Sequence, residues 1–272
     1  MSEDLPAAYQ TYYTHNSSGG AIARDFLYRV YRLAVALPGM LVGIQRARMS
    51  LESMFLADCE PGGLLDVGCG DGTFLARMRR RGWHVAGVDF DAKAIASAKR
   101  KYGLNLRQGE LRDAAFPPDS FDAITLNHVI EHVPQPLDVL VECRRLLKPQ
   151  GRLIVMTPNA AGLGHERFGS YWDGLDPPRH LHIFSSANLA KCARRAGLEV
   201  LVAESTAGRA DTIIGASYSI RDNPSHRRAV RPPPNLARTL KAVLFQFREH
   251  DQVRSGADVG EEVVLICAKA SA

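Results

Sequence analysis

The sequence has few cysteines, and none of them form a short paired motif. Only five of the 272 residues are cysteine, and no two are spaced as Cys-x-x-Cys. This spacing excludes a disulfide framework and a cysteine-based zinc site, and it predicts reduced thiols in a cytoplasmic protein. A metal held by histidines and carboxylates is not excluded by this argument.

Long hydrophobic runs are also lacking. Residues 1–10 are polar and acidic, without the apolar stretch of a secretory leader. The longest weakly polar run, Leu33–Ile44, is too short to span a bilayer and is interrupted by Pro38 and Gly39. Hydrophobic residues make up 46% of the chain and charged residues 23%. This composition excludes global disorder and is sufficient for one large α/β domain.

Basic residues are concentrated in two segments. Residues 21–49 carry a net charge of +4 and residues 221–254 carry +5, so the rest of this +5 chain sums to −4. Two interpretations stay open: patches that attract an anionic partner such as a phosphorylated substrate, a membrane surface or nucleic acid, and ordinary solvated faces. Apolar residues recur at helical spacing in Phe26–Leu37 and in Leu236–Phe247. Such helices pack on the domain or on a second subunit, or they lie in a membrane interface.

Between these segments, short apolar runs alternate with helical patterns. The alternation predicts an α/β fold with a doubly wound, mostly parallel sheet of seven strands. Residues 1–60 are expected to form an N-terminal arm and helices, and residues 61–272 the domain, with a helical insertion at about 205–258 before the last strand. The expected strands are residues 64–67, 84–88, 104–107, 121–126, 152–156, 198–203 and 263–268. The expected helices are residues 40–56, 73–81, 92–102, 134–147 and 186–196. Asp91 and Ser185 are expected to cap the helices that begin at residues 92 and 186.

A glycine-rich loop, Gly68-Cys-Gly-Asp-Gly72, connects the first strand to a helix. Its glycines permit a tight turn and let a ligand lie against the backbone, and N–H groups at a helix start favour a carboxylate or phosphate. The loop lacks the third glycine of the dinucleotide fingerprint. The next strand ends at Asp89, where an acidic residue can accept hydrogen bonds from both hydroxyls of a ribose, and Phe90 could pack against an adenine.

The segment Leu64–Thr73 resembles motif I of the class I methyltransferases, which use S-adenosylmethionine. Residues 118–126 resemble the fourth strand of that family, and residues 146–152 its turn into strand five, with Gln150 where glycine is more usual. The resemblance covers roughly residues 63–202 and the final strand. It implies a Rossmann-like methyltransferase fold, S-adenosylmethionine as cofactor and S-adenosylhomocysteine as product. It is nearly silent on the acceptor.

The resemblance also implies which residues contact the cofactor. Asp66 and Gly68 would face its methionine part, Asp89 its ribose, residues 110–111 its adenine, and residues 127–128 the methionine end. The implied set is Asp66, Gly68, Cys69, Gly70, Gly72, Asp89, Phe90, Glu110, Leu111, Asn127 and His128.

Two histidine-containing clusters, residues 127–134 and 171–184, follow the fourth and fifth strands. Both resemble a broad subfamily that includes the ubiquinone-type O-methyltransferases. In those enzymes a carboxylate and a Glu-His pair after strand four can hold a divalent metal. His128 stands here at the place of the first carboxylate, and hard cations prefer oxygen ligands, so the sequence assigns no metal to this chain.

Methyl transfer from a sulfonium requires that acceptor, methyl and sulfur be aligned, and that a hydroxyl acceptor lose its proton. Histidine suits this second task because its pKa lies near neutrality. The candidate catalytic residues are His132, His180 and His182. As the alternative, His132 braces its loop. Because His180 and His182 lie two apart in an expected extended segment, at most one of them faces the site.

The sequence therefore predicts methylation of a small molecule, most simply at a hydroxyl, with no DNA partner. A homodimer and peripheral membrane contact stay open. Residues 9–15 are expected to be a lid or a frayed terminus. Methylation of RNA or protein, or a non-catalytic cofactor-binding module, are the alternatives, but no RNA-binding module is evident. The candidate acceptor contacts are Tyr13, Trp172 and Arg179, with core packing as the alternative for Trp172.

Overall fold

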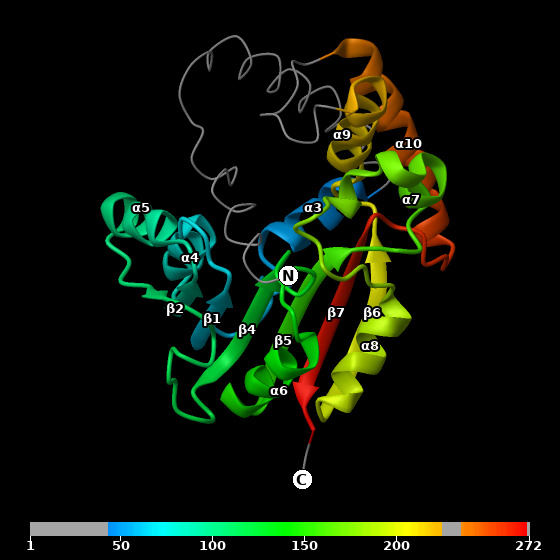
Figure 1. Cartoon of the computed structure of the whole chain (residues 1–272). Helices are drawn as coiled ribbons and strands as arrows, with labels where there is room; N and C mark the ends of the chain where they lie inside the picture. The colour runs from blue at the N-terminus through cyan, green and yellow to red at the C-terminus, as the bar shows by residue number, and fades with distance from the viewer. Residues whose placement is uncertain (1–42, 225–234, 271–272) are drawn as a thin grey trace. The chain divides into compact units, whose positions relative to one another are not determined.

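The computed structural model of the chain describes residues 43–224 and 235–270 (Figure 1). The predicted helix Phe26–Leu37, the predicted lid at residues 9–15 and Tyr13 lie outside the described residues. So does most of the polar segment that precedes Asn235. No helix in the two described ranges is both long enough and apolar enough to cross a bilayer.

The order of elements follows the predicted alternation of strands and helices. The strands are β1 (Gly63–Val67), β2 (His84–Asp89), β3 (Arg107–Gln108), β4 (Phe121–Asn127), β5 (Leu147–Pro158), β6 (Leu198–Thr206) and β7 (Glu262–Lys269). The helices are α3 (Ile44–Glu52), α4 (Thr73–Arg79), α5 (Ala92–Tyr102), α6 (Pro136–Leu146), α7 (Leu163–Phe168), α8 (Ser186–Arg195), α9 (Ala210–Asp222) and α10 (Leu236–Arg254), with short 3-10 turns at Gly169–Tyr171 and Asp173–Leu175.

The strands form one sheet in the order β3-β2-β1-β4-β5-β7-β6. β1 pairs in parallel with both β2 and β4, and β4 pairs in parallel with β5. Figure 1 shows β7 running against its neighbours. The predicted doubly wound, seven-stranded, mostly parallel sheet is therefore confirmed. The strand order reverses between β1 and β4, and in open α/β sheets ligands bind beyond the carboxyl ends of the strands at such a switch point.

Local signals explain most boundaries. The predicted caps are confirmed: the Asp91 side chain accepts from the Lys93 N–H, and that of Ser185 accepts from the Asn188 N–H. The strand predicted at 104–107 is wrong in its limits, because β3 covers only Arg107 and Gln108. Gly103 ends α5 with a left-handed φ of 63°, and the Leu104 N–H returns to the Ala98 carbonyl. Leu104 therefore belongs to the end of the helix rather than to the strand.

The helix α9 lies within the segment expected to be a helical insertion, but the sequence pattern does not predict its limits. Its sequence contains the turn-prone residues Gly215, Ser217 and Ser219, which weaken the helical pattern. In the structure Ser217 and Ser219 are buried, and the Ser217 hydroxyl donates to the Ile213 carbonyl one turn earlier at 2.8 Å. This bond satisfies the buried hydroxyl, and packing of the buried face therefore stabilises a helix that the propensities of its residues do not favour.

The chain divides into two compact units. Unit 1 contains the described residues up to Leu51 together with Pro158–His180 and Ser205–Glu262; unit 2 contains Glu52–Thr157, Leu181–Glu204 and the residues from Val263 onward. Unit 2 holds the hydrophobic core around the sheet, to which β4 contributes Ile124 and Leu126 and α6 contributes Leu140. The predicted domain limits, at residue 60 and for an insertion at about 205–258, stay predictions.

Unit 1 has a polar interior built around Glu261. One carboxylate oxygen of Glu261 accepts from the Gly164 N–H and the other from the Trp172 indole, each at 2.6 Å. The Glu261 N–H donates to the Glu249 carboxylate at 2.7 Å. Both glutamates are fully buried. Burial raises the pKa of Glu249 to about 9 and that of Glu261 to about 7, and the mutual repulsion of the two groups adds to the shift of Glu249.

Glu249→Gln is expected to reduce the loss of stability on going from pH 5 to pH 9. Folded Glu249 holds its proton up to about pH 9, whereas the unfolded group releases it near its ordinary pKa of 4.5, so rising pH favours unfolding of the wild type. Glutamine does not titrate. The free energy of unfolding should therefore fall less across this range in the variant, by roughly 2–4 kcal/mol. Urea unfolding at both pH values measures this, with exposed Glu199→Gln as control; equal losses in wild type and variant would refute the assignment.

Candidate cofactor and acceptor site

The glycine loop after β1 leaves one side of its backbone open. Gly70 has a φ of 53°, and a β-carbon placed on it would meet no heavy atom within 4 Å. Gly72, with a φ of 73°, is close-packed instead, because a β-carbon there would lie 3.0 Å from the Ala98 side chain. The N–H groups of Gly68 and Cys69 donate to the Val88 carbonyl at 2.8 and 3.2 Å. The loop is thus tied to β2 on one side and accessible to a ligand at Gly70.

Asp89 connects this loop to the start of α5. Its two carboxylate oxygens accept from the N–H of Gly70 at 2.8 Å and of Asp91 at 2.9 Å. The side chain is 8% exposed, and burial raises its pKa, against the effect of these hydrogen bonds. A carboxylate oxygen can accept more than one hydrogen bond, so Asp89 keeps acceptor capacity for the hydroxyls of a ribose. The adjacent Phe90 is 55% exposed, so its ring is accessible to a ligand.

Asp66 lies one residue before the end of β1 and is also buried. The Thr125 hydroxyl donates to its carboxylate at 2.7 Å, from the residue opposite it in the register of β1 and β4. Burial raises the pKa of Asp66 to about 7, with the nearby Asp89 charge as a smaller cause. A buried carboxylate with this pKa favours a cationic ligand, because the opposite charge would stabilise its ionised form. Thr125 is not among the residues that the sequence predicts for the site.

The other predicted cofactor residues lie at the same edge of the sheet or beside it. Glu110 and Leu111 follow β3, Glu110 exposed and Leu111 buried, after Gly109, whose N–H donates to the Asp89 carbonyl at 2.9 Å. Asn127 ends β4 and is exposed. Cys69 is buried, and burial raises the pKa of its thiol well above the ordinary value. Its role in the loop is therefore that of a small packed side chain, not a thiolate.

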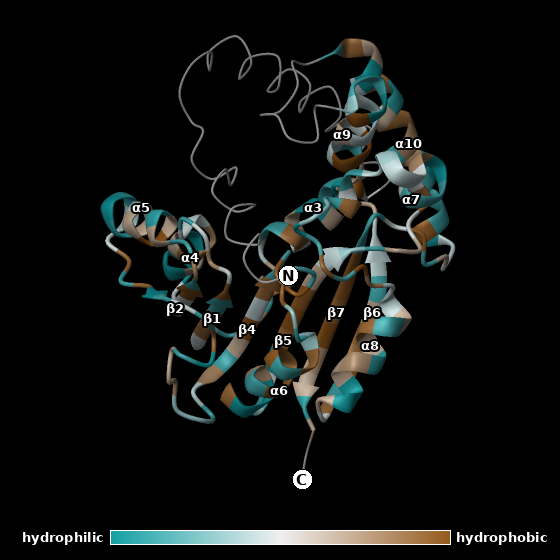
Figure 2. Ribbon diagram, viewed as in Figure 1, coloured by the Kyte–Doolittle hydropathy of each residue, from teal (hydrophilic) through white to brown (hydrophobic). Residues whose placement is uncertain are grey.

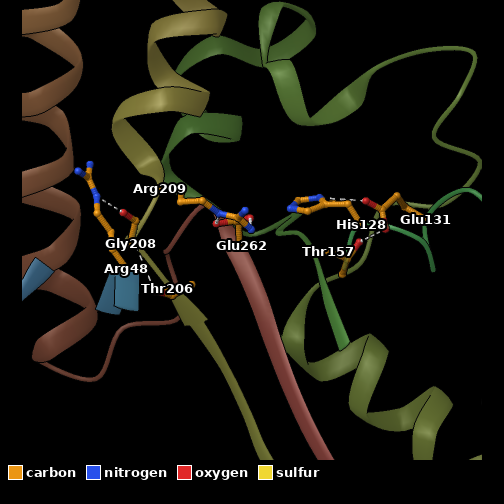
Figure 3. Close-up of polar contacts among 8 residues, drawn as sticks. All are labelled: Arg48, His128, Glu131, Thr157, Thr206, Gly208, Arg209 and Glu262. Atoms are coloured by element: carbon orange, nitrogen blue, oxygen red, sulfur yellow. Dashed lines mark hydrogen bonds and ion pairs between the residues drawn. The ribbon is translucent and has the colours of Figure 1, made fainter. Parts of the chain in front are cut away.

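A second polar group lies just after β4. His128 has a left-handed φ of 55°, and its Nδ1 lies 3.2 Å from a carboxylate oxygen of Glu131, which is fully buried (Figure 3). The other Glu131 oxygen accepts from the Thr157 hydroxyl at the end of β5 at 2.9 Å. The Glu131 carbonyl accepts from the N–H groups of Leu181 and His182. Glu131 therefore links three loops of unit 2, a role that its position in the sequence did not reveal.

The three predicted catalytic histidines occupy different environments. The His132 N–H closes a turn onto the Val129 carbonyl at 3.0 Å, and His182 Nε2 lies 3.4 Å from the Pro134 carbonyl; both residues belong to unit 2. His180 belongs to unit 1, where its Nδ1 lies 2.7 Å from the Gly174 carbonyl. Their catalytic roles stay predictions.

The extended conformation expected around His180 is wrong. Residues 177–179 form a turn, and the N–H groups of Arg179 and His180 both return to the Asp176 carbonyl, at 2.9 and 3.2 Å. Two consecutive prolines, Pro177 and Pro178, favour a turn over a strand. Strand alternation therefore does not decide which of His180 and His182 faces a ligand.

The predicted acceptor contacts among the described residues lie in unit 1. The Trp172 side chain is fully buried, and the His165 ring stacks on it with centroids 4.8 Å apart. Core packing thus describes its position, and contact with an acceptor stays a prediction. Arg179 forms an ion pair with Asp176 at 2.7 Å. Within unit 2, Glu131 and His132 each offer an atom of the kind that ligates a metal, and the expectation that the chain uses no metal stays a prediction.

Comparison with known proteins identifies the family. Residues 44–203, more than half of the chain, match a family model described as a methyltransferase domain. The chain belongs to this family. It is a member of the class I methyltransferases that use S-adenosylmethionine, as motif I predicted, and the predicted cofactor is confirmed at the level of the family.

Curated relatives and solved structures agree with this assignment. A ubiquinone biosynthesis O-methyltransferase from Neisseria meningitidis serogroup C is 30% identical over 183 residues, which cover 61% of this chain and 75% of that protein. A protein of the same name from Aeromonas salmonicida is 34% identical over 102 residues, covering 35% of this chain and 43% of its own length. A methyltransferase structure from Thermotoga maritima superposes with a TM-score of 0.54 at 20% identity, over 88% of this chain and 96% of that one, and shows the fold alone.

Asp89→Ala is expected to weaken the binding of S-adenosylmethionine about tenfold or more. If Asp89 holds the ribose as predicted, the substitution removes the acceptor for two hydrogen bonds, each contributing roughly 0.5–1.5 kcal/mol net and more when one partner is charged. Isothermal titration calorimetry measures the effect, with the exposed Asp58→Ala as matched control. An unchanged dissociation constant in a folded Asp89→Ala variant would contradict the ribose assignment.

Proposed function

We propose that this chain transfers the methyl group of S-adenosylmethionine to a hydroxyl oxygen of a small molecule. The observation that carries the proposal is the pairing of the His128 imidazole with the fully buried Glu131 at the carboxyl end of β4. An imidazole so placed is suited to remove a proton, and a hydroxyl is the common acceptor that must lose one. The O-methyltransferase name of the Neisseria relative supports the same reaction.

The residues of unit 2 fit the cofactor at the β1 and β4 ends. The open backbone at Gly70, the carboxylate of Asp89 and the exposed ring of Phe90 would hold its nucleoside part. Asp66, a buried carboxylate, would hold the cationic end of its methionine part. When bound, S-adenosylmethionine supplies a methyl group on a positively charged sulfur, which makes that methyl electrophilic. The protein then has to align the acceptor and exclude water.

His128 is the proton acceptor that the geometry favours. Glu131 holds its Nδ1, which orients the ring, and a carboxylate at this position stabilises the imidazolium formed when the ring takes a proton. Thr157 in turn holds the second oxygen of Glu131 and keeps the carboxylate in place. His132, His180 and His182 stay candidates for the same role; in unit 2 a ring nitrogen of His132 also lies within 4.8 Å of a Glu131 carboxylate oxygen.

Transfer from cofactor carrying a ¹³C-labelled methyl group tests the proposal. The protein is incubated with phenolic and sugar hydroxyl acceptors and, separately, with tRNA and with protein, and NMR identifies the atom that carries the label. We expect labelled methyl ethers of low molecular mass, with an equal amount of S-adenosylhomocysteine. Label in RNA or protein, or on nitrogen or carbon of the product, would refute O-methylation of a small molecule. Tight cofactor binding with no product from any acceptor would favour a non-catalytic module.

A further inference from the structure

The helix α10 of unit 1 exposes leucines and buries polar residues. Leu236, Leu240 and Leu244 are 85%, 58% and 61% exposed, while Gln246 and Glu249 on another face are fully buried. The leucines are spaced four residues apart, so they form one stripe along the helix. Figure 2 shows hydrophobic and hydrophilic residues interleaved along α10. The inward face of α10 also contains Ala242 and Val243, but its three leucines face outward, unlike the apolar stripe of an ordinary amphipathic surface helix.

Hydrogen bonds fix the helix in this orientation. The Gln246 amide donates to the carbonyls of Ala207 and Gly208 at 2.8 and 3.1 Å, and the Glu249 carboxylate accepts from the Glu261 N–H at 2.7 Å. Rotating α10 about its axis to bury its leucines would break these bonds and leave buried polar groups without partners. Each such group would lower the equilibrium constant for folding by several-fold to a hundredfold. The leucine stripe is therefore a stable part of the surface of unit 1 as the structure describes it.

Basic side chains flank the leucine stripe. Lys241, Arg248 and Arg254 are exposed on α10, and the exposed acidic residue on the same helix is Asp251. The net charge of the exposed residues is therefore positive along a helix that also presents leucines. An apolar stripe bordered by Lys and Arg is the composition of helices that lie in the plane of a membrane interface.

We propose that the leucine face, Leu236, Leu240 and Leu244 with Lys241 and Arg248, docks on an anionic lipid bilayer. The leucines would enter the boundary between headgroups and acyl chains, and the two basic side chains would contact lipid phosphates. This inference does not depend on the acceptor proposed above, because it concerns binding alone.

Charge argues against two other occupants of the leucine face. A second copy would bring two positively charged helices together, and three partly exposed leucines cannot supply the about 800 Å² per partner of a standard interface. The apolar segment Phe26–Leu37 carries Arg29 and Arg32 and no acidic residue, so it would not neutralise Lys241 and Arg248 either. An anionic lipid surface satisfies both the apolar and the basic part of the face.

Flotation of the full chain with phosphatidylcholine vesicles, with and without phosphatidylglycerol, tests the proposal. We expect flotation with the anionic vesicles at low salt, and at least a tenfold smaller partition coefficient at about 0.5 M NaCl, where the Debye length is only a few ångströms. Lys241→Gln should lower the coefficient about fivefold, the equivalent of 1 kcal/mol per basic residue. Leu240→Gln combined with Leu244→Gln should lower it at least tenfold. Leu201→Gln, on β6 of unit 2 and 48% exposed in the wild type, is the matched control and should bind as the wild type does.

Three outcomes would overturn the proposal. The first is a chain that stays unbound to anionic vesicles at low salt. The second is equal binding to neutral and anionic vesicles, which would remove the role of Lys241 and Arg248. The third is a dimer in analytical ultracentrifugation that dissociates in the Leu240→Gln, Leu244→Gln variant, which would make a second copy the occupant. Circular dichroism and thermal unfolding confirm that each variant is folded.

Discussion

Gly70→Val is expected to abolish the binding of S-adenosylmethionine, with at least a hundredfold loss of affinity. A side chain at Gly70 would project into space that the protein leaves open, since no heavy atom lies within 4 Å of its β-carbon position. In our proposal the cofactor lies there. The left-handed φ of 53° at Gly70 adds to the effect, because a β-branched residue disfavours this conformation. A change of backbone conformation there would also displace the Gly70 N–H, which donates a hydrogen bond to the Asp89 carboxylate.

Gly103→Val is the matched control for this variant. Gly103 also has a left-handed φ, 63°, and also has no heavy atom within 4 Å of its β-carbon position, but it ends α5 instead of forming the loop. Both variants therefore carry a similar backbone strain. Calorimetric titration should show loss of binding for Gly70→Val and near-normal binding for Gly103→Val. Equal affinities in the two variants would show that the cofactor does not approach the loop at Gly70.

His128→Ala is expected to lower kcat by roughly 10²–10⁴, the usual contribution of a general base. The dissociation constant of S-adenosylmethionine should change less than kcat, because the loop and Asp89 remain intact and only the predicted contact of His128 with the methionine end of the cofactor is lost. Glu131→Gln keeps an acceptor for Thr157 but removes the negative charge beside the imidazolium. Its pH–rate profile should keep the shape of the wild-type profile, with the acid limb displaced to lower pH. A merely structural role of Glu131 would not move that limb.

His84→Ala is the control for these variants, because His84 is an exposed residue at the start of β2. The measurement is steady-state kinetics between pH 6 and pH 9. Loss of turnover in His132→Ala or His180→Ala, together with normal turnover in His128→Ala, would transfer the proton-accepting role to those residues. Full activity of all three variants over the whole range would leave alignment of the reactants as the entire mechanism.

Much of unit 2 could be predicted because its signals are local. The period of the apolar residues identifies the strands, and the glycines of Gly68–Gly72 identify the turn. Asp91 and Ser185 each cap a helix by accepting a hydrogen bond from a backbone N–H two or three residues later. The position of Asp89 opposite the glycine loop follows from parallel pairing of β1 and β2. Each of these features depends on residues within one element or two neighbouring elements, so it can be predicted from the sequence.

The contacts that define the chemistry depend on register between distant elements. Thr125 meets Asp66 only because β1 and β4 pair in one particular alignment, and Thr157 meets Glu131 only because the end of β5 lies beside the loop after β4. A threonine within an apolar run signals a strand, not the partner of a carboxylate.

The orientation of α10 was equally hidden. Its leucines at i, i+4 and i+8 are typical of a buried stripe, but in the structure hydrogen bonds of Gln246 and Glu249 place another face inward. Apolar periodicity identifies a helix and a stripe, but buried polar side chains with specific partners decide which face the protein covers. Such partners lie far away in the sequence: Gln246 contacts Ala207, and Glu249 contacts Glu261.

Hydrogen–deuterium exchange with and without S-adenosylmethionine tests most directly the central claim, that the carboxyl ends of β1, β2 and β4 bind the cofactor. We predict that saturating cofactor slows exchange in peptides that contain the loop at Gly68–Gly72, Asp89–Asp91 and Gly109–Leu111, together with the turn after Asn127. Peptides from β6, α8 and α10 should exchange at the same rate with and without the cofactor. Protection confined to those other elements, or no protection at a concentration at which calorimetry shows saturation, would contradict the account.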